Sequence, residues 1–175
     1  MAGSNGKQKS ARDMILSLGL IVAAALVIYL FIPHDDGEPD LKRVDYTVEL
    51  ATARRAASYP VSAPVGLPET WKATSVRFDG ADSDAWHLGF RAPDGQYVQV
   101  EQSASAKRDR FVDDASQGAT ATDVTDEIAG AKWTRWTGGR YDALVLTGAD
   151  GSTTVVAGTA SFDRLAEMAR ALKTA

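Results

Sequence analysis

The sequence predicts an α+β protein with a single transmembrane helix, followed by an extracytoplasmic antiparallel β-sheet domain of about six strands that a C-terminal helix covers. Three features of the 175-residue chain predict it: a long uncharged apolar stretch near the start, apolar–polar alternation between turn dipeptides in the second half, and an apolar stripe at helical spacing at the end. They divide the chain into a cytoplasmic tail at 1–13, a transmembrane helix at 14–32, an acidic linker at 33–43 and the domain at 44–175.

The uncharged stretch, Met14–Ile32, has the length of a membrane span. Its 19 residues cover roughly 28 Å as a helix, close to the roughly 30 Å of a bilayer's hydrocarbon core. Basic residues precede it and acidic residues follow it, and basic residues stay on the cytoplasmic side. The topology determinants are Lys7, Lys9 and Arg12. We therefore expect a single-pass protein of the cell membrane with a cytoplasmic N-terminus and an extracytoplasmic C-terminal domain.

A cleaved signal peptide is the alternative reading of this stretch. Ala23-Ala24-Ala25 offers small residues at the spacing that cleavage requires. Cleavage there would leave the apolar run Leu26–Ile32 at the new N-terminus. This consequence favours an uncleaved anchor.

Composition and charge exclude several classes of protein. The chain has no cysteine, which excludes disulfides, thiol nucleophiles and cysteine-bound metals, and its two histidines are too few for an all-histidine metal site. Residues 33–175 hold 16 of the 19 basic and 22 of the 23 acidic groups, a net charge of −6. This acidic balance argues against nucleic acid as a partner. We expect no cofactor and no metal.

The domain begins with an expected short strand at 44–50, where Val44, Tyr46, Val48 and Leu50 alternate with polar residues, and an expected helix at 49–58. Prolines force an extended, turn-broken path over 59–68. Expected strands then lie at 71–78, 85–91, 97–103, 131–137, 140–147 and 152–158, with 122–128 as a further candidate and a short helix at 105–116. The final helix starts after Ser161 as N-cap.

No catalytic residue follows from the motifs. The nucleophile elbow G-x-S-x-G, the phosphate-binding loop and the dinucleotide fingerprint are absent. His87 is the one histidine of the domain and has no base or orienting partner beside it in the sequence. Asp79, Asp82 and Asp84 do not match the EF-hand spacing, so a solvated loop is the better interpretation.

A ligand or partner surface is the hypothesis that these residues favour. Strand alternation places His87 and Arg91 opposite the apolar face of their strand, and Glu101 and Gln102 lie on the next strand of the hairpin. Trp133 and Trp136 fall on opposite faces of one strand, so one of them is expected to face a groove or solvent. The alternative is that all four tryptophans pack in the core. The predicted surface comprises His87, Arg91, Glu101, Gln102 and Trp136.

Short motifs along most of the chain resemble one family. They are Arg12-Asp13-Met14 with Ser17-Leu18, Tyr59-Pro60-Val61 with Pro64, Gly66-Leu67-Pro68 with Trp71, Thr74-Ser75, Trp86-His87-Leu88-Gly89-Phe90, Glu101-Gln102-Ser103 and Gly158-Thr159-Ala160. Together they resemble the domain of unknown function 4245 family, single-span envelope proteins found mainly in high-GC Gram-positive bacteria. The resemblance implies a membrane-anchored extracytoplasmic domain and implies no activity.

The leading hypothesis is a membrane-anchored binding or accessory module of the cell envelope, touching an envelope protein, a lipid or a wall component. One alternative is an envelope hydrolase or transferase that uses carboxylates such as Glu101 and Asp142, brought together only by folding. Another is a structural subunit of a membrane complex in which the span itself is the interface.

Overall fold

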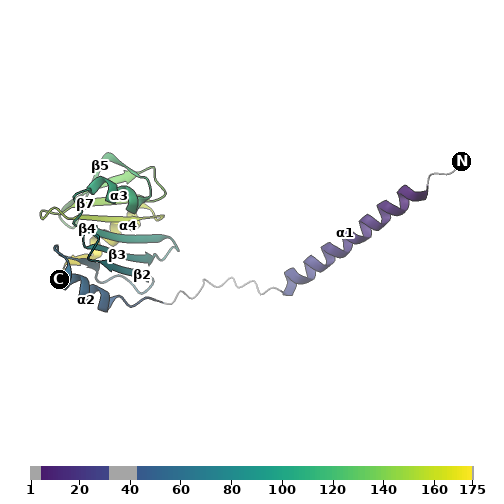
Figure 1. The fold of residues 1–175 in the computed structure, drawn as a ribbon, viewed down its shortest axis with the longest axis horizontal. Helices are drawn as coiled ribbons and strands as arrows, with labels where there is room; N and C mark the ends of the chain where they lie inside the picture. Colours follow the sequence, from purple (N-terminus) through teal and green to yellow (C-terminus); the bar gives the residue numbers. More distant parts are fainter. Residues whose placement is uncertain (1–4, 32–42, 175) are drawn as a thin grey trace. The chain divides into compact units, whose positions relative to one another are not determined.

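The computed structural model describes the backbone of residues 5–31 and 43–174, and the side chains of residues 12–29 and 43–174. It contains two separate units, an N-terminal helix and a folded α+β domain (Figure 1). Residues 1–4 of the expected tail and the expected linker up to residue 42 lie outside the described residues. The side chains of Lys7 and Lys9 also lie outside them.

Helix α1 spans Asn5–Phe31 and contains the expected span up to residue 31, and residue 32 lies outside the described residues. Within it, Arg12–Tyr29 is long and apolar enough to cross a membrane, and none of this window is buried inside the protein. A signal sequence near the N-terminus has the same length and composition. The helix is therefore a candidate anchor.

The domain is built on a seven-stranded antiparallel sheet, one strand more than the sequence predicts. Its order is β2-β3-β4-β8-β7-β6-β5. The strands are β2 (Lys72–Asp79), β3 (Ala85–Arg91), β4 (Tyr97–Ser103), β5 (Thr120–Ile128), β6 (Ala131–Thr137), β7 (Asp142–Thr147) and β8 (Thr153–Gly158). The α+β class and the antiparallel sheet are confirmed.

Tight turns join neighbouring strands in two hairpins of this sheet, β3–β4 and β5–β6. Ala129 and Gly130 both have positive φ, 54° and 78°, as the two central residues of a type I′ turn require. Gly95, with φ of 81°, closes the turn between β3 and β4. Both turns join strands that are adjacent in the sheet, so local sequence favours the pairing within each of these two hairpins.

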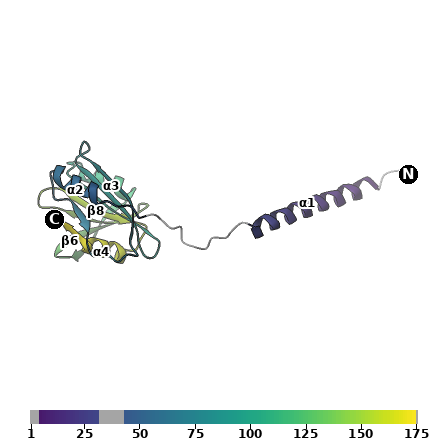
Figure 2. The same cartoon turned by 90° about the horizontal axis from the view of Figure 1, so that it is seen from below.

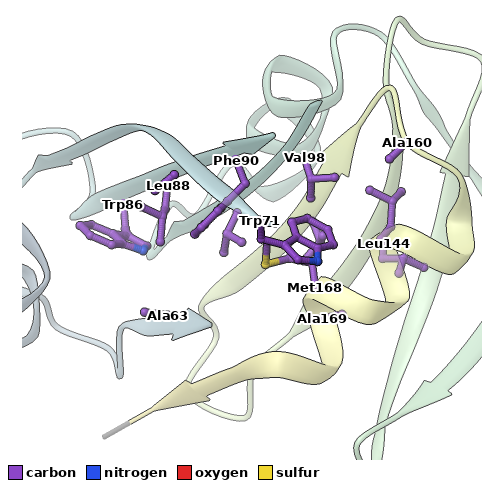
Figure 3. Packing of buried hydrophobic residues seen from close by; sticks show 14 of the residues in the cluster. Ala63, Trp71, Trp86, Leu88, Phe90, Val98, Leu144, Ala160, Met168 and Ala169 are labelled. Atoms are coloured by element: carbon purple, nitrogen blue, oxygen red, sulfur yellow. The ribbon is translucent and has the colours of Figure 1, made fainter. Parts of the chain in front are cut away.

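The main core lies on one face of the sheet. Trp86, Leu88 and Phe90 alternate along β3 toward this face, and α4 (Phe162–Ala171) covers it with Leu165, Met168 and Ala169. Figure 3 shows Trp86, Leu88 and Phe90 of the sheet with Met168 and Ala169 of the helix in this core. The prediction that the C-terminal helix packs on the sheet is confirmed.

The opposite face carries a smaller apolar cluster under α3 (Arg108–Ser116). Val112 and Ala115 of α3 pack on Val145 of β7 and on Val155 of β8. Figure 2 shows α3 and α4 on opposite sides of the sheet. At its other end, over β2, β3 and β4, this face carries polar side chains.

The N-terminal part of the domain differs from the prediction. The expected strand at 44–50 is wrong, because α2 (Thr47–Ala56) already begins there. The Asp45 carboxylate accepts hydrogen bonds from the Thr47 amide (2.9 Å) and hydroxyl (2.6 Å), which stabilises the first turn. Tyr46, Leu50 and Ala53 all contact the core. Their spacing of four and three residues is that of one face of a helix.

Two short strands that the sequence does not predict close the main core. β1 (Ser62–Pro64) pairs with β9 (Leu172–Thr174), directly after α4. The pair ties the proline-rich segment to the C-terminus. Ser161 stands at the N-cap of α4 as expected, without a side-chain capping bond.

Candidate functional site

Polar side chains of three adjacent strands meet on the face that bears α3. In the register of β2, β3 and β4, His87 stands directly opposite Arg77 on one side and Glu101 on the other. Ser75 stands opposite Gly89, two residues along β3 from His87. Directly paired residues point to the same face. Ser75, Arg77, His87, Arg91 and Glu101 are called the His87 face below.

Both ring nitrogens of His87 have partners. Nδ1 lies 2.6 Å from Oε1 of Glu101, and Nε2 lies 2.8 Å from Oγ of Ser75. An ionised carboxylate only accepts hydrogen bonds, so its partner nitrogen Nδ1 carries the proton. In a neutral ring Nε2 then accepts from the Ser75 hydroxyl; this tautomer is assigned from the partners of the ring. The hydrogen-bonded chain therefore runs from the Glu101 carboxylate through the His87 imidazole to the Ser75 hydroxyl.

The pair of His87 and Glu101 is partly accessible to solvent. The side chains are 18% and 16% exposed, respectively. Such exposure leaves room for a ligand to reach the ring, while the surrounding strands hold its orientation.

A second set of hydrogen bonds connects Tyr97, which lies beside Ser75, to α3. The Tyr97 hydroxyl lies beside that of Ser75 over Gly89 and donates to Oε1 of Gln99 at 3.1 Å. The Gln99 side-chain amide donates to the Ala115 carbonyl oxygen of α3 at 2.7 Å. Gln99 is 7% exposed, and a buried amide needs such partners. Gln99 therefore ties Tyr97 to the backbone of α3, next to the hydrogen-bonded chain of Glu101, His87 and Ser75.

The Tyr97 hydroxyl keeps its proton at neutral pH. Burial of the ring raises its pKa above the ordinary value of 10.0, and the nearby Glu101 charge raises it further. Tyr97 is thus a neutral hydroxyl beside Ser75.

Gly89 makes the contact between the two hydroxyls sterically feasible. A Cβ on residue 89 would clash with Ser75 Oγ and would stand 2.9 Å from the Tyr97 hydroxyl oxygen. Real Cβ atoms do not approach other atoms so closely. The absence of a side chain at Gly89 is therefore what lets Ser75 and Tyr97 meet over β3.

Of the five residues predicted for the surface, the structure brings two into contact, His87 and Glu101. Arg91 lies on the same face opposite Tyr97, with its guanidinium close to Gly95 in the turn. Gln102 and Trp136 lie outside the His87 face.

Gln102 points to the other face and holds β1 in place. It is 3% exposed, its Oε1 accepts from the Ser62 amide at 2.7 Å, and its amide donates to the Thr154 hydroxyl at 2.9 Å. Gln102 is thus part of the packing between the main sheet and β1.

Trp136 is buried on the α3 side of the sheet. It lies on β6, with β7, β8 and β4 between it and β3, so roughly 19 Å of sheet separates it from His87. Trp133 faces the main core on the other side, and all four tryptophans are at most 8% exposed. The expectation that one faces a groove or solvent is wrong; the core-packing alternative is confirmed.

The two carboxylates Glu101 and Asp142 do not lie together, and the aspartate loop forms no metal cluster within the described residues. Glu101 shares a face with His87, whereas Asp142 alternates with Ala143, which packs under α3, and so points to the opposite face. Asp84 accepts from the Ser58 hydroxyl (2.7 Å) and amide (2.9 Å), and these bonds lower its pKa. Within the described residues, no three His, Asp or Glu side chains are placed to hold a metal ion.

A small hollow lies on the main-core side of the sheet. It measures about 180 Å³, and its walls include Tyr46, Trp71 and Phe90. Ligand sites for whole small molecules are larger, roughly 300–1,000 Å³. The hollow fits only a small group and is separated from the His87 face by the sheet.

Comparison with known proteins decides the family. The family described as "Protein of unknown function (DUF4245)" matches residues 7–172. The chain belongs to the DUF4245 family. No curated protein and no solved structure matches it. The match includes the candidate span Arg12–Tyr29 and every residue of the His87 face, so both belong to the part of the chain that the family model covers.

Sequence reasoning missed Ser75, Tyr97 and Gln99. One signal was available for the central pair: His87 and Glu101 are each seven residues from Asp94, the middle of the Pro93-Asp94-Gly95 turn. A symmetric hairpin about this turn pairs them.

We predict that Gly89→Ala separates the Ser75 and Tyr97 hydroxyls and lowers the free energy of unfolding by about 1–3 kcal/mol, because the added methyl group overpacks the site. The measurement is denaturant unfolding of the full-length protein in detergent. Gly80→Ala is the matched control, since its nearest contact would be an ordinary 3.6 Å to Phe78. Equal stability of the two variants would contradict the prediction.

Proposed function

We propose that this DUF4245 protein is a membrane-anchored binding or accessory module of the cell envelope, with its N-terminus in the cytoplasm and its α+β domain outside. The observation that carries the proposal is the pairing of two features in one chain: an apolar helix without buried residues and a partly exposed polar site in the domain.

The apolar helix supports the anchor. Its large side chains, such as Leu20 at 73% and Ile21 at 64%, are exposed within the described part of the protein. Exposed apolar surface of this extent is unfavourable in water and favourable in a bilayer. Cleavage after Ala23-Ala24-Ala25 would remove only part of this apolar surface.

The charge distribution supports the orientation. Lys7, Lys9 and Arg12 precede the apolar stretch, whereas the segment after it is acidic. The positive-inside rule then retains the N-terminus in the cytoplasm. An acidic domain is also repelled from an anionic membrane surface, which keeps its faces open to partners.

The His87 face supports the binding role. It combines donors, acceptors and charge within a few ångströms, and the Arg77 side chain beside His87 is exposed. Polar groups that converge in a partly desolvated place orient a ligand. An anionic or polar component of the envelope is the ligand that these groups favour.

The location is tested with single cysteines, since the chain has none of its own. We expect Ala149→Cys, in an exposed loop, to react with a membrane-impermeant maleimide in intact cells, and Ser10→Cys to react only after permeabilisation. Protection of Ala149→Cys in intact cells would contradict the orientation. A mature protein from which residue 10 has been removed would contradict the uncleaved anchor.

The binding role is tested by photo-crosslinking in native membranes, with the photoreactive residue at Asp79. This position is exposed and shares its side of β2 with Arg77. The control probe is at Val48, which is 72% exposed on α2. We expect one adduct from position 79 that disappears when Arg77, His87 and Glu101 are all replaced by alanine. No adduct, or the same adduct from Val48, would contradict the role of this face.

A further inference from the structure

We propose that Ser75, His87 and Glu101 form a nucleophile–base–carboxylate triad that transfers the acyl group of small esters to water. The proposal goes beyond the binding role and does not depend on where the protein resides. It begins from the connection of atoms: Glu101 Oε1 to His87 Nδ1 at 2.6 Å, and His87 Nε2 to Ser75 Oγ at 2.8 Å.

This connection is the one that activates a hydroxyl. The carboxylate fixes the ring in the tautomer with Nδ1 protonated, which leaves the Nε2 lone pair directed at the serine proton. A serine hydroxyl is a weak nucleophile until a base within hydrogen-bond distance accepts its proton. Both distances lie within that range.

The local backbone presents Ser75 to this side of the sheet. The pairing of β2 with β3 shifts between Ala73 and Ser75, so Thr74 is an extra residue at a β-bulge. Bulges redirect side chains and are frequent beside active sites. Without the shift, Ser75 would share a face with Ala73, which is buried in the main core.

A donor for the developing oxyanion stands beside the nucleophile. Tyr97 keeps its proton at neutral pH and lies beside Ser75, and Gln99 holds its hydroxyl in place at 3.1 Å. A positioned donor of this kind stabilises the tetrahedral intermediate of acyl transfer. In the proposal, Tyr97 turns its proton from Gln99 to the oxyanion.

The surroundings define the class of substrate. Ser75 is half-buried, and the His87 and Glu101 side chains are only 18% and 16% exposed, so a small acyl group is the one that reaches them most easily. Arg77 is exposed directly opposite His87. A positive charge so close to the base favours an ester that carries an anionic group.

The chemical step balances with water as the second reactant. Ser75 Oγ attacks the ester carbonyl carbon while its proton moves to His87 Nε2; the intermediate expels the alcohol, which takes that proton. Water then attacks the acyl-serine and gives a proton to Nε2, and collapse returns the proton to Ser75 Oγ as the carboxylic acid leaves. The net change is ester plus water to acid plus alcohol.

The first test uses the full-length protein in detergent and a fluorophosphonate probe, followed by intact-mass and peptide mass spectrometry. Because the chain has no cysteine, thiols cannot compete for the probe. We expect one probe per chain, on Ser75, no labelling of Ser75→Ala, and labelling at least about 100-fold slower in His87→Gln. The matched control is Ser58→Ala, which removes an exposed serine whose hydroxyl donates to the Asp84 carboxylate at 2.7 Å without a histidine; its labelling should equal that of the unaltered protein.

Absence of label from Ser75 in the unaltered protein would overturn the proposal, and this outcome requires no variant to fold. Equal labelling of the unaltered protein and His87→Gln, at unchanged circular dichroism, would also overturn it.

The second test measures ester hydrolysis. We expect 4-nitrophenyl acetate to be hydrolysed about 10-fold or more slowly by Tyr97→Phe, and Arg77→Gln to slow mono(4-nitrophenyl) succinate more than the neutral acetate. Equal rates for Tyr97→Phe and the unaltered protein would remove Tyr97 from the mechanism. A failure of these assays leaves the crosslinking result on the His87 face unaffected, so the two proposals are separable.

Discussion

The register of the β3–β4 hairpin is the constraint on which the rest of the domain depends. It places His87 opposite Glu101 on one face and, at alternate positions, Trp86, Leu88 and Phe90 in the main core on the other. Because side chains alternate with a period of two, a slip by one residue would exchange these sets and bury the imidazole and carboxylate in apolar surroundings. The hydrophobic effect therefore fixes the polar pair: the core holds the apolar face inward, and the His87 face is formed as the other side of the same strands.

The polar network is stabilised because each of its buried members has a partner. Gln99 connects Tyr97 to the backbone of α3, and the Ser75 hydroxyl has His87 as its partner. A half-satisfied network would cost more than an apolar one. The same bonds orient the His87 ring from both nitrogens, which is more than packing alone requires at a site that is 18% exposed. These two hydrogen bonds, which fix the orientation of the ring, are the physical reason for proposing that His87 acts as a base.

The sequence predicts most of the fold, because strands with local turns carry their own signals. The β3–β4 hairpin and α4 were identified with nearly their observed bounds. The strand at 44–50 was wrong, since Tyr46, Leu50 and Ala53 fit a helix equally well. Alternation alone excludes Gln102 from the face of Glu101, because consecutive strand residues point to opposite sides. The place of Ser75 on the His87 face could not be predicted from the sequence, because the bulge at Thr74 reverses the alternation after Ala73. No sequence pattern marks this bulge. Trp136 was misplaced because the strand order between β3 and β6 is set by non-local pairing.

The central claim is the tautomer and hydrogen bonding of His87, and nitrogen NMR of the imidazole tests it most directly. The chain has only two histidines, so a His34→Gln variant of the full-length protein in micelles leaves one ring to observe. We predict that the neutral form of the ring carries its proton on Nδ1, in a strong hydrogen bond that Glu101→Gln weakens, and has an unprotonated Nε2 whose signal shifts in Ser75→Ala. A ring protonated at Nε2, or a spectrum unchanged by both substitutions, would contradict it.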